Sequence, residues 1–138
     1  MLSQTCRYAI RALAFMAAEP EQWHDVGSMA KALDIPANYL SKILGQFSKL
    51  DLLASRKGRG GGYRLARDPA TVCLRDIVLP IDGSERSARC AFGLPECSDD
   101  DPCPLHDEWK QVKERFENML STRTLADIAD HPHSRPAL

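Results

Sequence analysis

Three cysteines and one histidine lie close together in this 138-residue sequence and could bind a metal. The pattern is Cys-x6-Cys-x5-Cys with a histidine three residues further on, formed by Cys90, Cys97, Cys103 and His106. Glycine and proline are frequent in the same stretch, which favours a loop able to wrap three thiolates around one centre. Thiolate and imidazole together suit a tetrahedral zinc ion or an iron–sulfur cluster, and the spacing alone leaves both open. The acidic run at residues 99–101 would repel an anionic centre, so we expect it to face solvent.

The cysteine count also bears on the compartment. The chain has five cysteines, an odd number, and no signal-peptide pattern at its start. In a reducing compartment, cysteines serve as metal ligands, redox groups or buried hydrophobes more often than as disulfides. No apolar run approaches the roughly 18–20 residues that cross a bilayer. We therefore expect a cytoplasmic protein that does not bind membranes, with Cys6 and Cys73 as small buried residues.

The net charge of −1 is an average over two unlike halves. Residues 1–70 hold 10 Lys/Arg and 6 Asp/Glu, whereas residues 71–138 hold 8 and 13. Basic residues are densest between positions 42 and 67, where 7 Lys/Arg accompany a single acid. This division predicts a basic binding surface joined to an acidic module. With 43% hydrophobic residues, the chain is expected to fold and not to be disordered.

Hydrophobic periodicity predicts the elements that carry this basic surface. Apolar side chains recur at three- and four-residue steps in several segments, which is typical of amphipathic helices. A glycine run at residues 58–62 is expected to turn between a strand at 52–57 and another at 62–66. Helices followed by such a hairpin form a winged helix-turn-helix. The helices expected before the cysteine loop span residues 4–18, 26–33, 36–50 and 74–81.

Polar and basic side chains on the third helix and on the hairpin are the expected DNA contacts. Short polar side chains near a helix N-terminus reach base edges in the major groove, and lysines further along meet phosphates. An arginine at the wing tip can enter a narrow minor groove. A solvated helix and a glycine hairpin with no ligand are the alternative. The expected contacts are Asn38, Tyr39, Ser41, Lys42, Arg56, Lys57, Arg59 and Arg64.

Taken together, these motifs resemble the winged-helix transcription regulators that include the iron–sulfur regulator IscR and the nitric-oxide sensor NsrR. The resemblance covers about residues 1–125 and is carried by RYAIRAL, IPANYLSKIL, GRGGGYRLA, LRDIV and the cysteine triad. It implies that the helix after the cysteine loop pairs two subunits over a roughly palindromic operator in double-stranded DNA. The implied dimer-interface residues are Leu105, Trp109, Val112, Phe116, Met119 and Leu120.

The resemblance also bears on the fourth ligand. IscR-like proteins use a histidine just after the third cysteine, and His106 stands at that place. NsrR-like proteins use an acid from the partner's first helix, where this chain has Arg7. The resemblance therefore implies a Cys3His site, with a 2Fe-2S cluster favoured over 4Fe-4S and zinc as the alternative. The first cysteine gap of six residues is one longer than is common in these regulators.

We therefore predict a mainly α fold with a small β-hairpin, made of a winged helix-turn-helix domain and a long dimerisation helix. The expected divisions are a DNA-binding domain (1–82), a cluster-binding loop (83–104), a dimerisation helix with a short extension (105–130) and a flexible tail (131–138). The predicted function is a homodimeric, non-enzymatic transcription regulator whose cluster senses redox state, nitric oxide or iron–sulfur status. A zinc-stabilised DNA-binding or interaction module and a thiol-based redox enzyme are the alternatives.

Overall fold

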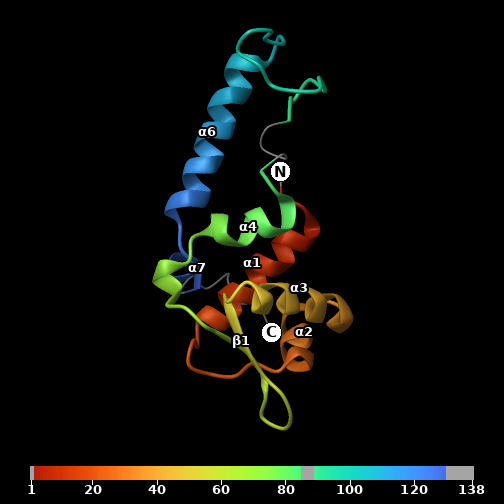
Figure 1. Ribbon diagram of the computed structural model, residues 1–138, viewed down its shortest axis with the longest axis vertical. Coiled ribbons are helices and arrows are strands. Elements are labelled where there is room, and N and C mark those ends of the chain that lie inside the picture. Colours follow the sequence, from red (N-terminus) through yellow and green to blue (C-terminus); the bar gives the residue numbers. More distant parts are fainter. Residues whose placement is uncertain (1, 85–88, 130–138) are drawn as a thin grey trace.

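The structure is a computed structural model that describes residues 2–84 and 89–129 (Figure 1). It is mainly helical with a two-stranded antiparallel hairpin, as predicted, and each expected boundary before the cysteine loop is met to within one residue. The short turn η1 and the last helix, α7, were not anticipated, and the predicted flexible tail lies outside the described residues. The elements are α1 (Gln4–Ala17), α2 (Val26–Leu33), α3 (Ala37–Lys49), β1 (Leu53–Arg56), β2 (Gly62–Leu65), η1 (Pro69–Thr71), α4 (Leu74–Asp82), α6 (His106–Thr122) and α7 (Leu125–Ala129).

Local side chains begin and end the first helices. The Ser3 hydroxyl accepts a hydrogen bond from the Cys6 N–H at the start of α1, and the Asp25 carboxylate accepts one from the Ser28 N–H at the start of α2. Such caps satisfy backbone donors that have no partner inside the helix. At the end of α2, Asp34 adopts a left-handed conformation with φ +54°, which short polar side chains tolerate. This residue makes the turn that leads into α3.

One hydrophobic core holds together the winged body, which we define as residues 2–84 together with 120–129. Its fully buried side chains include Leu13 of α1, Phe47 of α3 and Leu125 of α7. Backbone hydrogen bonds tie α7 in place, because the Leu74 N–H donates to the Arg123 carbonyl and the Leu125 N–H to that of Val72. The C-terminal extension therefore completes the core of the winged body.

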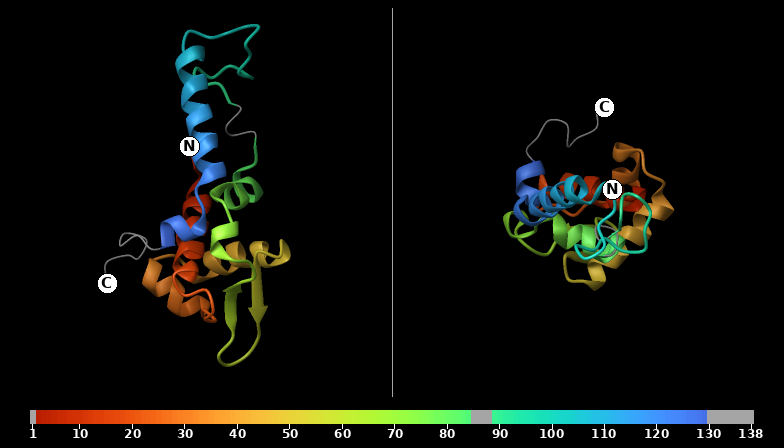
Figure 2. Two further views of the ribbon diagram at one scale, coloured as in Figure 1. Left: turned by 90° about the vertical axis from the view of Figure 1, so that its left-hand side faces the viewer. Right: turned by 90° about the horizontal axis from the view of Figure 1, so that it is seen from above.

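The remaining described residues form a projecting arm, which we define as residues 89–119. Figure 2 shows α6 extending away from the winged body, with the cysteine loop at its far end, while the hairpin lies at the opposite end of the molecule in Figure 1. Of the described arm residues, Phe116 alone packs against the hydrophobic core of the body. The two ends of the long axis thus carry the two kinds of predicted site.

Membrane insertion was not expected from the sequence. Across the described ranges, no helix combines the length and the apolar character needed to span a bilayer.

Candidate nucleic-acid interface and metal centre

The outer face of α3 carries three of the predicted DNA contacts. Asn38, Ser41 and Lys42 are exposed, whereas the apolar stripe on the other face of the helix is buried in the core. The helix follows Pro36, which supplies no side-chain cap, so no side chain occupies its first backbone N–H groups. The positive end of a helix attracts phosphate. The first turns of α3 therefore combine short polar side chains, a lysine and free backbone donors on one exposed surface.

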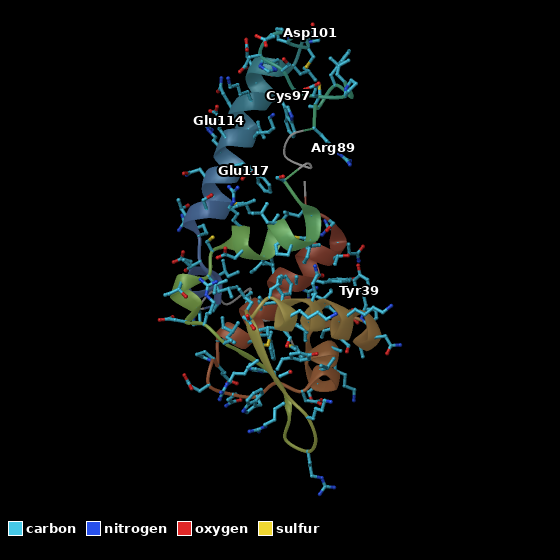
Figure 3. The ribbon with its side chains drawn as sticks, viewed as in Figure 1. Tyr39, Arg89, Cys97, Asp101, Glu114 and Glu117 are labelled. Atoms are coloured by element: carbon cyan, nitrogen blue, oxygen red, sulfur yellow. The ribbon has the colours of Figure 1, made fainter. Side chains whose placement is uncertain are left out.

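Tyr39, also predicted to contact DNA, makes contacts with α1. Its hydroxyl is hydrogen-bonded to that of Thr5 on α1, and its ring meets the ring of Tyr8 edge-on with centroids 5.7 Å apart. Figure 3 labels this residue at the edge of the body. The phenol thus links the first turn of α3 to α1, while the side chain stays 38% exposed and its contact with DNA remains a prediction. Helical spacing could not show this link, because the partner lies 34 positions away.

The wing divides its basic residues into two pairs. Lys57 and Arg59 are exposed near the turn. Arg56 and Arg64 instead stack on the indole of Trp23, with guanidinium carbons 4.6 and 4.5 Å from the ring centroid. Such cation–π contacts fix a guanidinium by its face. Sequence analysis did not identify Trp23, because it lies in the loop between α1 and α2, outside every motif.

Two glycines of the wing are required by close backbone contacts. A Cβ on Gly61 would lie 2.2 Å from the Arg56 carbonyl oxygen, and one on Gly62 would lie 2.0 Å from that of His24. Gly62 also has φ +132°, which L side chains rarely adopt. The loop before α2 hydrogen-bonds to the hairpin through His24 and Tyr63. The glycine run therefore lets chain segments approach one another, in addition to turning the wing.

The four predicted metal ligands meet in two pairs at the tip of the arm. The Cys90 Sγ donates to the Cys103 Sγ at 3.5 Å, and the Cys97 Sγ lies 3.4 Å from His106 Nδ1. Cys90, Cys103 and His106 are buried, and Cys97 is half-buried. Figure 3 shows Cys97 near the far end of α6. In the part of the chain that the structure describes, no three Cys, His, Asp or Glu side chains yet surround a single point as a metal site would require.

Backbone donors distinguish two of the thiols. At Cys90, burial works to raise the pKa, but hydrogen bonds to the backbone at Leu94, Phe92 and Gly93 outweigh it and lower the pKa of the thiol. At Cys103, burial raises the pKa of the thiol, and the neighbouring Cys90 adds to the increase. The thiolate is the form that binds metals. Cys90 is therefore the better prepared ligand of this pair.

The acidic run beside the thiols contains a residue whose role the sequence did not indicate. The Asp99 carboxylate lies 2.7 Å from His106 Nε2 and 3.0 Å from Lys110 Nζ. Hydrogen bonds from His106 and Lys110 lower the pKa of Asp99, and Asp99 in turn raises that of Lys110. We expected this run to face solvent. Although the Asp99 side chain is 70% exposed, it binds Nε2 of the predicted ligand His106, whose Nδ1 is directed at Cys97.

The predicted dimer-interface residues of α6 fall into three groups. Leu105, Val112 and Met119 are exposed to 44%, 45% and 41%, and they recur every seven residues, the spacing of a coiled-coil seam. Trp109 and Phe116 are half-buried beside them. Leu120 is only 3% exposed and belongs to the core of its own chain. Its assignment to the dimer interface is therefore corrected, because the end of α6 turns this face towards the body.

Comparisons with known proteins place the chain in a family. The Rrf2 family, described as iron-dependent transcriptional regulators, matches residues 2–131. The chain is 28% identical over 131 residues to the HTH-type transcriptional regulator IscR of Yersinia enterocolitica, covering 94% of this chain and 79% of that protein.

Solved structures share the same fold. IscR from T. potens superposes with a TM-score of 0.72 at 27% identity, covering 93% of this chain and 85% of that one. CymR, the global cysteine regulator of B. subtilis, gives a TM-score of 0.79 at 22% identity, covering 94% and 95%, and at that identity bears on the fold alone. Family members are DNA-binding regulators and not enzymes. The chain, with its helix-turn-helix, its hairpin wing and this family match over residues 2–131, belongs to the Rrf2 family of winged helix-turn-helix transcription regulators.

Proposed function

We propose that this protein is a homodimeric transcription regulator whose affinity for its operator is controlled by an iron–sulfur cluster. The cluster ligands are Cys90, Cys97, Cys103 and His106. The observation that carries the proposal is the pairing of these side chains at the tip of the arm, with Cys90 Sγ 3.5 Å from Cys103 Sγ and Cys97 Sγ 3.4 Å from His106 Nδ1. The description of the family as iron-dependent and the similarity to proteins named IscR support it.

The chemistry of the donor set fits a cluster. Three thiols and one imidazole supply four soft ligands, and Cys97 acts electrostatically on the Cys103 thiol across the two pairs. Histidine ligands of metals commonly donate their second N–H to a carboxylate, which fixes the ring and its tautomer. Asp99 stands in that position on His106 and leaves Nδ1 free to bind. Metal binding then requires the two pairs to close on one centre.

The same donor set admits two kinds of occupant. A Cys3His set with an available imidazole favours 2Fe-2S over 4Fe-4S in this proposal, and zinc remains the second candidate because it also takes three thiolates and one histidine. A bound iron–sulfur cluster would supply a centre open to oxidation and to attack by nitric oxide, whereas a zinc ion would only stabilise the fold of the loop. Sensing therefore depends on which of the two is bound.

The exposed stripe of α6 supports a homodimer. Leu105, Val112 and Met119 would form a seam with the same residues of a second copy, because a sevenfold apolar repeat keeps one face of a helix against its partner. Two winged bodies would then present two α3 helices to half-sites about one helical turn apart. In this arrangement Asn38, Ser41 and Lys42 contact the major groove, and Lys57 and Arg59 extend from the wing.

The position of α6 suggests how a change at the cysteine loop could alter DNA binding by the winged body. The cysteine loop leads directly into α6, and α6 packs against α4 of the body. A change at the loop therefore acts on the helix that sets the spacing between the two bodies of the dimer. By linkage, such control requires the two cluster states to differ in DNA affinity, typically by about 1–3 kcal/mol of coupling free energy.

The decisive experiment on the cofactor uses anaerobically purified protein. We expect visible absorbance, with iron and sulfide in equal amounts, and its loss when Cys90, Cys97 or Cys103 is replaced by serine. Cys73→Ser is the matched control, because Cys73 caps α4 in the body and bonds to Asp76, and it should retain the colour. A colourless protein that holds one zinc ion per subunit would contradict the sensing proposal.

The experiment on DNA compares the cluster-loaded and cluster-free protein on the same operator. We expect a roughly 5- to 150-fold difference in the dissociation constant, which corresponds to the coupling above. Lys42→Ala and Arg59→Ala should weaken binding and reduce its dependence on salt, since each phosphate contact contributes about −0.9 to the logarithmic salt slope. Their visible absorbance should be unchanged. Equal binding in both cluster states, or unaltered binding by both variants, would contradict the proposal.

A further inference from the structure

Trp23 lies where the loop before α2 crosses the base of the wing. The His24 N–H donates to the Tyr63 carbonyl at 2.8 Å, and the Tyr63 N–H donates back to the His24 carbonyl at 2.9 Å. In an antiparallel bridge the flanking residues face one another, so Trp23 stands opposite Arg64. The absence of a side chain on Gly62 allows this crossing, because a Cβ there would overlap the His24 carbonyl. The indole is thus carried to the wing by backbone geometry.

The two arginines reach this indole from neighbouring strands. Arg56 pairs with Gly62 in the hairpin register, and Gly62 and Arg64 lie two residues apart on β2, so both arginines lie on one face of the hairpin. Each guanidinium carbon is within 4.6 Å of the same ring centroid. Two like charges held this close would repel one another in isolation. The negative π-system of the indole offsets that repulsion by cation–π attraction.

Stacking leaves the hydrogen-bonding edges of the guanidiniums available. A guanidinium that rests on an aromatic ring by its face keeps its in-plane N–H donors, which match the oxygens of a phosphate. Arg56 donates one of these to the Gly60 carbonyl at 2.7 Å, which also closes the wing turn. Within residues 2–84 and 89–129, no acceptor takes a hydrogen bond from the Arg64 guanidinium and no carboxylate pairs with either arginine. This leaves two oriented cations with donors to spare.

We propose that Trp23, Arg56 and Arg64 form a preassembled site for a phosphate of the DNA backbone, in which Trp23 is the positioning residue. The inference rests on DNA binding by the winged body and is independent of the cluster. Long arginine side chains lose rotamer freedom when they are ordered on a ligand. Here the indole orders them before DNA arrives, which lowers that loss. A phosphate contact carries no sequence information, so the site adds affinity to every DNA, operator or not.

The test measures the dissociation constants of the full-length protein for an operator duplex and for an unrelated duplex across a series of salt concentrations. Trp23→Leu should weaken binding to both duplexes by the same factor, about tenfold, and Trp23→Phe should restore most of the affinity, because a smaller aromatic face still stacks. Arg64→Ala should lower the logarithmic salt slope by about 1 per subunit. Asn38→Ala, in contrast, should weaken the operator more than the unrelated duplex.

Two further variants separate positioning from folding. Arg64→Lys keeps the positive charge but lacks the planar group, so it should weaken binding while thermal unfolding stays at the wild-type temperature. Arg67→Ala is the matched control, because this exposed arginine donates to the Thr71 carbonyl away from the stack and its removal should leave the salt slope unchanged. Wild-type affinity in both Trp23→Leu and Arg64→Lys would overturn the phosphate site. If the wild-type protein bound neither duplex, DNA binding itself would be refuted instead.

A spectroscopic readout follows the indole directly. The chain has two tryptophans, so Trp109→Phe leaves Trp23 as the sole indole emitter. Added DNA should shield Trp23 from acrylamide quenching, because the bound duplex closes the solvent side of the stack. Quenching that DNA does not change would count against the assignment.

Discussion

The winged body is richer in apolar residues than the projecting arm, and the two regions use these residues differently. In the body, Phe47 and Leu13 are fully buried by side chains from helices distant in sequence. In the arm, Phe92 is 59% exposed, and Leu105 and Val112 are exposed along α6. Burial of an apolar side chain contributes about 1.5–3 kcal/mol, so the body is stabilised by its own chain. The arm leaves the same kind of side chain in water.

This difference indicates what each region depends on. The body can be complete in one chain, because its core is closed by α7 from the C-terminal side. The arm has the four predicted metal ligands in two pairs and an apolar stripe without a cover among the described residues of this chain. Its stability is therefore expected to come from a second copy and from a metal, which makes it the region suited to respond to conditions.

The largest effect expected is on the body core. Phe47→Ala should lower the free energy of unfolding by about 3–5 kcal/mol, because the cavity left by a buried aromatic ring does not collapse. Phe92→Ala in the arm should leave this free energy within about 0.5 kcal/mol of the wild-type value. Urea denaturation of both variants provides the measurement. Similar losses in the two variants would show that the arm shares the cooperative core.

The next effect concerns the stripe of α6. Val112→Lys should convert a dimer to a monomer by placing a charge in the seam. The affinity for the operator should then fall on the order of 100-fold, because each monomer binds its half-site separately. Analytical ultracentrifugation gives the oligomeric state. Asn118→Lys adds the same charge on an exposed position off the stripe and should remain dimeric. A monomeric wild-type protein, or a Val112→Lys variant that stays dimeric, would show that the stripe of α6 is not the dimer interface.

A smaller effect is expected at the carboxylate beside the ligands. Asp99→Asn should release iron to a chelator about tenfold faster, because His106 loses the charged partner that orients its ring. The unfolding of the body should not change, since the contact lies wholly within the arm. Asp101→Asn removes an equal charge from an exposed neighbour labelled in Figure 3 and serves as the control. Equal release rates for the two variants would assign Asp99 no role in holding the metal.

The smallest effect is at the start of α7. The Thr124 N–H donates to the Asp127 carboxylate at 2.8 Å, and Thr124 Oγ1 accepts from the Asp127 N–H, so the two residues cap the helix reciprocally. Thr124→Ala should cost about 1 kcal/mol in the free energy of unfolding, whereas Thr122→Ala on the exposed surface of α6 should cost less.

The same cap predicts a pH dependence. The backbone N–H of Thr124 lowers the pKa of Asp127 below its usual value, so the ionised carboxylate stabilises the folded state at neutral pH. That contribution is lost as the pH falls through the lowered pKa. Unfolding curves measured from pH 7 down to acid should therefore converge for wild type and Asp127→Asn. A constant difference between them across this range would rule out the proposed linkage.

Much of the body followed from local pattern. The helical period, the break at Pro36 and the glycine run predicted every element up to α4 except the short turn η1, because each depends on neighbours within a few residues. The partners of individual side chains did not follow. The bond of Tyr39 to Thr5 and the contact of Arg56 with Trp23 could not be predicted, since both partners come from segments more than 30 residues away. Periodicity predicts which face of a helix or strand a side chain lies on. It does not predict which residue of another segment that side chain will contact.

At the arm, composition and spacing alone were enough to predict the four candidate ligand residues and the apolar face of α6. Only the tertiary structure decided that Asp99 holds His106, that Leu120 belongs to the core of its own chain, and that the cysteine loop and the wing lie at opposite ends of the molecule. The physical reason is that spacing and period are properties of consecutive residues. Burial and pairing are properties of the packed chain, in which residues distant in sequence compete for the same space.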